Sequence, residues 1–497
     1  MAAEGTRYRF GPLERRGLVA GWRGGQIASV AGGLVVAVLV LRSRPTVASV
    51  VIAVVTVVGG VALACWPVAG RTGEEWLPTV TRFGAAGLAG SRRHRSTSPA
   101  IGHVLGPDGP AAAPAGGRGR HHAGAGPFAG LSLLAAGDGY GTCGVVFDRR
   151  ARTYTAVLAL QGHSFALLGP AEKERRVGGW ANVLASLARQ GSAVHRVQWL
   201  AAVLPDDGRA VRGHLADRSV LDPGEPARRS YAALLDGAGA STCRHEVHLA
   251  VQVSAVGPGG RAVRAAGGGH AGACAVLLRE AGTLRRMLAE ADVVVEGVLG
   301  PGALAAVVRR SGEAGPLPAA VGADEGAFAP WPMAAEAGWG SLRADGVWHA
   351  TYWIAEWPRV EVGPDFLGPL LLGPVRRTVS VVMEPLSPAL AVRQVEQART
   401  ADLADSELRR RGGFLPTARR AREQALVTRR EEELADGHAS FRYSGYVTVT
   451  APTEALLEGA CEATEQAAGL CSLELRRLYG DQDRGLTCTL PLCRGLA

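Results

Sequence analysis

Two long uncharged stretches near the N-terminus restrict this chain more than any other feature. Residues 24–41 and 45–70 are 18 and 26 residues long and carry no charged side chain. As helices rising about 1.5 Å per residue, both can cross a hydrocarbon core of about 30 Å. Only Arg42, Ser43 and Arg44 separate them. A cleaved signal peptide has one shorter apolar core, so we predict a two-helix transmembrane hairpin instead.

The residues at the ends of these stretches predict how the hairpin is oriented. Arginines gather before the first stretch and after the second, whereas the loop between them has only two. Because cytoplasmic flanks are enriched in Lys and Arg, we expect a multi-pass protein of the cell (inner or plasma) membrane, with both termini in the cytoplasm. The expected membrane-flanking residues are Arg15, Arg16, Trp22, Arg23, Arg42, Arg44, Trp66 and Arg71.

The length of the chain predicts several folded units. Its 497 residues exceed what one hydrophobic core usually holds. We expect a basic cytoplasmic N-terminus (1–23), the hairpin (24–70), a juxtamembrane segment and Pro/Gly/Ala-rich linker (71–127), a first α+β domain (128–345) and a second (346–497).

Hydrophobic periodicity predicts that helices and strands are mixed along this body. In the first domain we expect strands at 153–160, 194–204, 245–256 and 293–299, and helices at 171–190, 271–291 and 303–310. In the second we expect strands at 347–354, 374–384, 443–450 and 473–478, helices at 387–411, 417–436 and 453–468, and a terminal strand at 486–490. This order predicts an α+β body with ferredoxin-like (split βαβ) units.

The lysine and cysteine content excludes two classes of site. Lys173 is the only lysine among 54 basic residues, and no glycine-rich segment precedes it. A P-loop requires a lysine after such a segment, so this chain is not a P-loop ATPase. None of the eight cysteines forms a Cys-x-x-Cys pair. Structural zinc sites use clustered pairs, so we expect reduced thiols and no metal or cofactor.

Two short motifs resemble catalytic or phosphate-binding loops. Residues 162–166 place Ser164 after a strand, as in a hydrolase nucleophile elbow, but the last position is alanine and a Gly-Pro pair follows. Residues 267–272 match Gly-x-Gly-x-x-Gly, yet no strand directly precedes them. We therefore expect no catalytic residues and no enzyme activity, and keep a membrane-tethered hydrolase using Ser164 as a lesser alternative.

Aromatic and basic clusters in the second domain are the candidate surfaces for partner docking. Tryptophans crowd around residue 350, and arginines gather around residue 415 among glutamates. Core packing and a solvated helix face are the alternatives. The net charge of +9 also suits nucleic acid, which we do not favour because the arginines fit a GC-rich genome equally well. The candidate docking residues are Trp348, Trp353, Trp357, Phe366, Arg409, Arg410, Arg411, Arg419 and Arg420.

Residues 355–371 read AEWPRVEVGPDFLGPLL, and this segment resembles a known family. It is similar to actinobacterial integral-membrane proteins that are encoded beside PrgI-like proteins and a type IV secretion-type ATPase. Residues 152–160, 199–206, 377–381 and 490–495 share the likeness. The resemblance implies a non-enzymatic, membrane-anchored structural component of a type IV secretion-like or conjugation apparatus. It would dock a partner ATPase and a PrgI-like small membrane protein within an oligomeric assembly.

A neighbouring system supplies the main alternative. The EccE-type membrane component of type VII secretion also combines two N-terminal spans with a soluble body. The motor ATPase that co-purifies with the chain would separate the two systems.

Overall fold

The computed structural model describes most of the chain and divides it into two compact units. Unit 1 is Met1–Gly11, Arg93–Gln397 and Ala425–Ala497, and unit 2 is Pro12–Arg92 and Ala398–Gln424. The described residues are Phe10 and residues 24–43, 46–68, 71–95, 104–105, 126–137, 141–161, 165–205, 209–222, 224–238, 243–310, 331–411 and 418–496.

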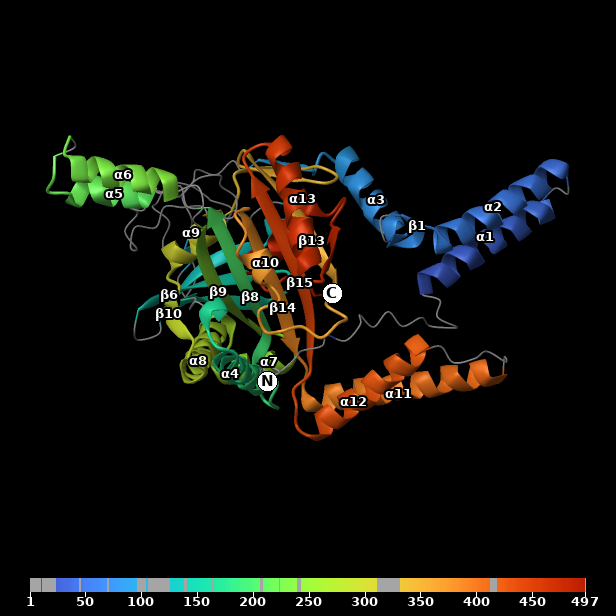
Figure 1. Cartoon of the computed structure of the whole chain (residues 1–497). Coiled ribbons are helices and arrows are strands. Elements are labelled where there is room, and N and C mark those ends of the chain that lie inside the picture. Colours follow the sequence, from blue (N-terminus) through green and yellow to red (C-terminus); the bar gives the residue numbers. More distant parts are fainter. Residues whose placement is uncertain are drawn as a thin grey trace, which may run out of the picture. The chain divides into compact units, whose positions relative to one another are not determined.

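Unit 2 contains the two apolar helices expected from the sequence. Helix α1 is Gly24–Ser43 and α2 is Val47–Cys65, and they pack side by side (Figure 1). The side chain of Thr46 accepts a hydrogen bond from the Ser49 backbone N–H, and the Thr46 backbone N–H donates one to Ser49 Oγ, so a capping box begins α2. The short strands β1 (Pro67–Val68) and β2 (Arg71–Thr72) then lead into α3 (Gly73–Leu88).

A 14-stranded sheet forms the centre of unit 1. Its strands follow the order β3-β11-β12-β13-β15-β14-β8-β9-β7-β6-β5-β4, with β10 beside β7 and β16 beside β13. All described pairs are antiparallel except β4–β5. The strands are β3 (Arg93–Arg95), β4 (Val104–Leu105), β5 (Leu131–Gly137), β6 (Thr142–Asp148), β7 (Thr153–Gln161), β8 (Val194–Pro205), β9 (Cys243–Ser254), β10 (Val294–Val298), β11 (Ala334–Ala337), β12 (Leu342–Ala344), β13 (Val347–Glu356), β14 (Arg377–Pro385), β15 (Phe441–Ala451) and β16 (Glu474–Arg477).

Helices connect these strands. They are η1 (Gly126–Phe128), η2 (Phe165–Leu167), α4 (Pro170–Leu187), α5 (Arg209–Arg218), α6 (Pro226–Ala238), α7 (Gly257–Ala265), α8 (Gly269–Glu290), α9 (Pro301–Arg310), α10 (Gly368–Leu371), α11 (Pro388–Arg411), α12 (Ala418–Ala435), α13 (Glu454–Leu470) and α14 (Gln482–Cys488). Helices α5 and α6 contact each other and extend away from the sheet (Figure 1).

The sheet contains the same strand arrangement twice. The first quartet has the order β10-β7-β9-β8, and the second has the order β16-β13-β15-β14. In each quartet a helix pair lies between the second and third strands along the chain, α5–α6 in one and α11–α12 in the other. The quartets join where β8 pairs antiparallel with β14. Each of these is the second strand of its quartet along the chain, so a local twofold axis relates the two edge strands.

The two faces of the sheet are covered differently. Helices α4 and α8 pack on the first quartet and α13 on the second, with Val197, Leu249 and Val447 among the buried residues of this face. Helices α9 and α14 and the C-terminal tail cover the opposite face, where Leu200 and Leu492 are buried. Alternate residues of each strand therefore enter separate cores.

The expectation of helices mixed with an antiparallel sheet, after two apolar N-terminal helices, is confirmed. The predicted strand at residues 486–490 is wrong, because this segment belongs largely to α14. A short apolar run has no periodicity that separates a strand from a buried helix. Here Leu486 and Leu490 pack down onto the sheet face and pair with no neighbouring strand. The sequence analysis also missed β5 and β6, and β3 lies inside the predicted juxtamembrane segment.

Candidate functional site

Small residues form the contact between α1 and α2. A Cβ added at Gly33 would lie 3.0 Å from the Thr56 carbonyl oxygen and 3.6 Å from the Cα of Gly60. Backbones that approach this closely are typical of helices packed in lipid, where van der Waals contact drives association. The buried residues of the pair are Gly33, Ala37, Ser49, Ala53, Gly60 and Ala64.

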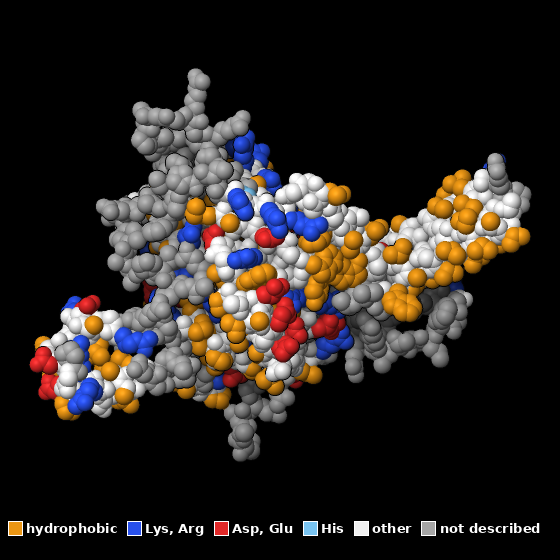
Figure 2. Space-filling model, turned by 90° about the horizontal axis from the view of Figure 1, so that it is seen from above, with side chains coloured by type: hydrophobic (Ala, Val, Ile, Leu, Met, Phe, Trp, Pro, Cys, Tyr) orange, Lys and Arg blue, Asp and Glu red, His pale blue; other side chains and the backbone are white. Residues whose placement is uncertain are grey.

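Large apolar side chains cover the outside of the pair. Leu39 is 61% exposed, Val55 64% and Val58 60%. Figure 2 shows hydrophobic side chains along the outer surface of the helices. Both helices are long and apolar enough to cross a membrane. A soluble domain would bury such side chains, so this inside-out distribution indicates a membrane location.

The predicted membrane-flanking residues are only partly described. Arg42 lies in the last turn of α1, Trp66 follows α2 and is 71% exposed, and Arg71 lies in β2. Exposed tryptophan at a helix end suits a membrane interface. The remaining predicted residues lie outside the described part: Arg15, Arg16, Trp22, Arg23 and Arg44.

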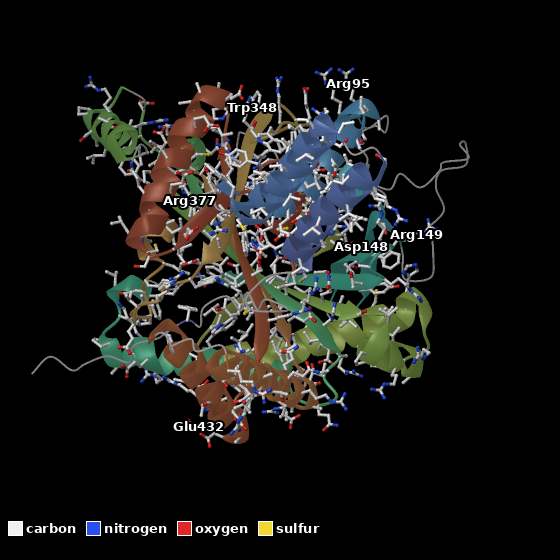
Figure 3. All side chains as sticks on the ribbon, turned by 90° about the vertical axis from the view of Figure 1, so that its right-hand side faces the viewer. Arg95, Asp148, Arg149, Trp348, Arg377 and Glu432 are labelled. Atoms are coloured by element: carbon white, nitrogen blue, oxygen red, sulfur yellow. The ribbon has the colours of Figure 1, made fainter. Side chains whose placement is uncertain are left out.

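The predicted aromatic docking residues do not form one surface. Trp348 lies on the face of β13 that packs against the α13 core, with the Arg343 guanidinium 5.8 Å from its ring centre. Trp353 lies on the opposite face, and its Nε1 donates to Ser444 Oγ at 3.0 Å. Both side chains are half-buried. Figure 3 labels Trp348.

Trp357 and Phe366 do come together, and Phe10 lies against both. The Phe10 ring is 5.2 Å from that of Trp357 and 5.4 Å from that of Phe366. Tyr443 meets Trp357 edge-on at 5.5 Å. These distances are typical of favourable aromatic pairs. We call these four residues, Phe10, Trp357, Phe366 and Tyr443, the aromatic site. Phe10, which precedes α1 in the sequence, therefore covers the rings that the body supplies.

The predicted basic docking residues lie at the junction of two helices. Arg409, Arg410 and Arg411 end α11, and Arg419 and Arg420 lie in the first turn of α12. Arg411 is exposed and pairs with Glu407 at 3.0 Å. Farther along α12 an Arg429–Glu433 pair and the exposed Glu432 follow (Figure 3). Interleaved pairs of this kind are typical of a solvated helix face.

A second basic surface, which the sequence analysis missed, lies between α4 and α8. An open groove of about 880 Å³ is lined there by four arginines and two acidic residues. Arg176 pairs with Glu172 at 3.0 Å across one helical turn. Residues 175–176 and 285–286 are neighbours only in the folded chain, so no local sequence motif predicts the groove. The arginines are Arg175, Arg176, Arg285 and Arg286.

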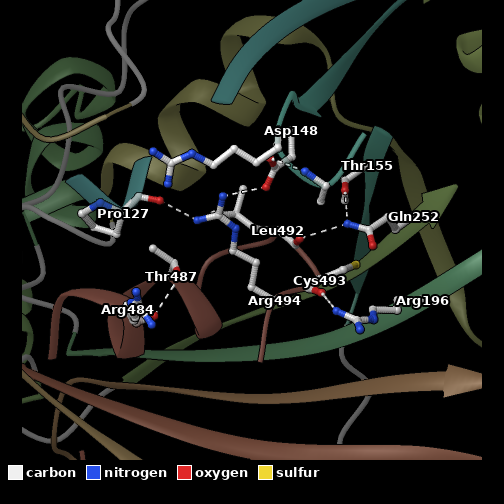
Figure 4. Close-up of polar contacts among 12 residues, drawn as sticks. Pro127, Asp148, Thr155, Arg196, Gln252, Arg484, Thr487, Leu492, Cys493 and Arg494 are labelled. Atoms are coloured by element: carbon white, nitrogen blue, oxygen red, sulfur yellow. Dashed lines mark hydrogen bonds and ion pairs between the residues drawn. The ribbon is translucent and has the colours of Figure 1, made fainter. Parts of the chain in front are cut away.

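A buried polar network holds the C-terminal tail against the sheet (Figure 4). Gln252 Nε2 donates to the Leu492 carbonyl at 3.2 Å, and the Cys493 backbone donates to Gln198 Oε1 at 2.7 Å. Arg494 pairs with Asp148 at 2.6 Å. Buried polar groups need such partners, so this network has a structural role. The scattered glutamines gave no sequence signal for it.

Burial shifts the pKa values of several described titratable groups. Burial, with a smaller contribution from Arg376, lowers the pKa of His349 to about 3, and burial also lowers the pKa of His248. Burial raises the pKa of Cys488 to about 12, which keeps this thiol protonated and unreactive. No group of three metal-ligating side chains occurs among the described residues.

Of the two loops that resemble catalytic or phosphate-binding motifs, the structure describes the glycine-rich one in full. Ser164 lies outside the described residues. The glycine motif at residues 267–272 follows helix α7, whereas a dinucleotide fingerprint must follow a strand.

One family is similar to part of this chain. The sequence model of EccE, described as a putative type VII ESX secretion system translocon, matches residues 241–354. The match extends from the start of β9 into β13 and so includes parts of both quartets. No curated protein matches the chain. Together with the two apolar helices, the match supports a secretion-system membrane component. It favours the EccE alternative over the type IV-like expectation.

Proposed function

We propose that this chain is a non-enzymatic, EccE-type membrane component of a type VII secretion system. The EccE match over residues 241–354 is the observation that carries this proposal. It falls in the body of a chain whose α1 and α2 suit a two-span anchor. The body would then act by docking other components and not by chemistry of its own.

The chemical character of the body supports a scaffold. Its buried histidine His349 stays neutral because burial lowers its pKa, and its buried thiols stay protonated because burial raises theirs. The buried side chains of Gln198 and Gln252 hold the C-terminal tail. An energy source would come from a separate motor ATPase.

Both ends of the chain are proposed to lie in the cytoplasm. The aromatic site supports this topology, because Phe10 precedes α1 whereas Trp357 follows α2. Two spans return the chain to the side on which it began, so this contact is compatible with an even number of spans.

We further infer that the two quartets are ferredoxin-like units. Numbered along the chain, each has the strand order 4-1-3-2 with antiparallel neighbours, which is the order of a split βαβ unit. In each unit a helix pair replaces the short hairpin between strands 2 and 3. These helix pairs, α5–α6 and α11–α12, would be the parts through which the two units contact different partners.

A second candidate rests on residues 355–371, which resemble the PrgI-linked proteins of type IV-like systems. This segment follows directly after the EccE match and carries Trp357 and Phe366 of the aromatic site. A partner ATPase and a small membrane protein would be its expected neighbours.

Affinity purification of the tagged full chain from native membranes in a mild detergent tests the proposal. We expect a type VII motor ATPase and other membrane components of that system to co-purify as one assembly. Recovery of a type IV-type ATPase would support the second candidate instead. Labelling of Ser164 by a fluorophosphonate probe would contradict the non-enzymatic role.

A further inference from the structure

Helix α3 has an inverted distribution of side chains for a helix in water. Its exposed half carries Leu77, Val80 and Leu88, which are 57%, 48% and 95% exposed. The other exposed positions of Gly73–Leu88 are Pro78, Thr81, Gly84 and Ala85, so no charged residue belongs to this half.

Two of the three charged residues of α3, Glu75 and Arg82, lie on its more covered side. The third, Glu74, lies in the first turn beside the apolar half, where it is half-buried against Gly25 of α1. At 100° per residue, Leu77, Val80 and Leu88 fall within about 80° of one another, whereas Glu75 and Arg82 fall on the opposite side. Both charged side chains are half-buried. A helix that exposes its apolar half and covers its charged half is suited to an apolar medium.

The position of α3 next to the spans indicates which medium this is. A Cβ added at Gly73 would lie 2.8 Å from Leu63 Cδ2 in the last turn of α2, and one added at Gly25 would collide with the Glu74 carboxylate. The first turn of α3 therefore meets both the end of α2 and the start of α1. In a two-span hairpin these two ends lie at the same face of the bilayer.

We propose that α3 is an interfacial helix whose Leu77–Val80–Leu88 face lies in the lipid surface. The inference rests on the proposed membrane anchoring. Figure 1 shows α3 running at an angle to α1 and α2, as a helix that leaves the spans along the interface would. Arg92 follows α3, where anionic lipid headgroups would attract its guanidinium. The spans and α3 thus form one continuous surface for lipid.

Photo-crosslinking of the full chain in phosphatidylcholine–phosphatidylglycerol vesicles tests this proposal. The probe p-benzoylphenylalanine replaces Leu77, Val80 or Leu88, and lipid adducts are detected by mass spectrometry. Val55, an exposed residue of α2, is the positive control, and the more covered Ala86 of α3 is the matched negative control. We expect lipid adducts at Val55 and at the three α3 positions, with several-fold less at Ala86.

The outcomes separate the interfacial helix from the anchor. Adducts at Val55 with only protein crosslinks, or none, at the three α3 positions would overturn the interfacial helix and leave the anchor standing. Absence of adducts at Val55 would overturn the anchor as well. The Leu77→Asp/Leu88→Asp variant sharpens the test. It should lower adduct formation at Val80 several-fold and leave that at Val55 unchanged, whereas an unchanged Val80 yield would contradict the proposal.

Discussion

The two quartets share one strand order, but their first crossovers differ greatly. In the first quartet the crossover is α4, an 18-residue helix that packs beside α8. In the second it is α10, which has four residues, and the loop around it carries Trp357 and Phe366. Phe10 covers these two rings. The second quartet has no long helix at this crossover, and the Phe10 ring packs on the loop that stands there.

The largest expected effect concerns the C-terminal tail that covers both quartets. Leu492 is 3% exposed and packs in the core beneath α9 and α14. Leu492→Ala should lower the free energy of unfolding by about 2–5 kcal/mol, because it leaves a cavity. Urea denaturation of the purified chain measures this change. Leu390→Ala, at a position 51% exposed, is the control and should have little effect. If Leu492→Ala lowered the free energy of unfolding no more than Leu390→Ala does, the tail would not be stabilising the two quartets.

Acid should destabilise the second quartet through His349. Burial holds the pKa of this imidazole at about 3, whereas the unfolded chain has a value near 6.5. Below about pH 6.5 the unfolded state therefore binds the proton first, and stability falls by up to about 1.4 kcal/mol per pH unit until the folded pKa is reached. Denaturation at pH 7 and pH 5 measures the loss, and His349→Gln should reduce it. Identical pH dependence in the variant would count against a buried neutral histidine.

The aromatic site should contribute a smaller coupling. In a double-mutant cycle, Phe10→Ala and Trp357→Ala should be coupled by about 0.5–1.5 kcal/mol, because their rings stack. The matched control pairs Phe10→Ala with Trp180→Ala on α4, which should be additive. A coupling with Trp180 as large as that with Trp357 would remove the contrast between the two crossovers.

The smallest effect is expected at the basic junction of α11 and α12. Arg411 is 75% exposed and pairs with Glu407 across one helical turn. Arg411→Ala should change the free energy of unfolding by less than about 0.5 kcal/mol. Because stability stays unchanged, any loss of partner recovery in affinity purification would identify Arg411 as a docking residue. A large loss of stability would show that this arginine supports the fold.

Long periodic segments were the predictable part of this fold. The strands expected at 194–204 and 443–450 coincide with β8 and β15, because alternating apolar residues over eight or more positions leave little ambiguity. The helices expected at 171–190 and 271–291 coincide with α4 and α8 for the same reason. The hairpin was predictable from length and hydrophobicity alone.

Contacts between distant segments were not predictable. The β8–β14 junction depends on two edge strands that match only in space. The Phe10 site joins residues more than 340 positions apart, and the arginine groove needs α4 beside α8. Trp348 and Trp353 are five residues apart and so fall on opposite faces of β13, which a tryptophan-rich segment does not reveal unless the strand register is known.

Reporter topology in intact cells tests the central claim most directly. The account requires residues 1–23 and the whole body on the cytoplasmic side, since Phe10 must reach Trp357. Reporters fused before Met1 and after Ala497 should both behave as cytoplasmic, and one inserted at Ser43 as external. A reporter at Met1 on the side opposite to that at Ala497 would contradict the two-span anchor and the Phe10 contact together.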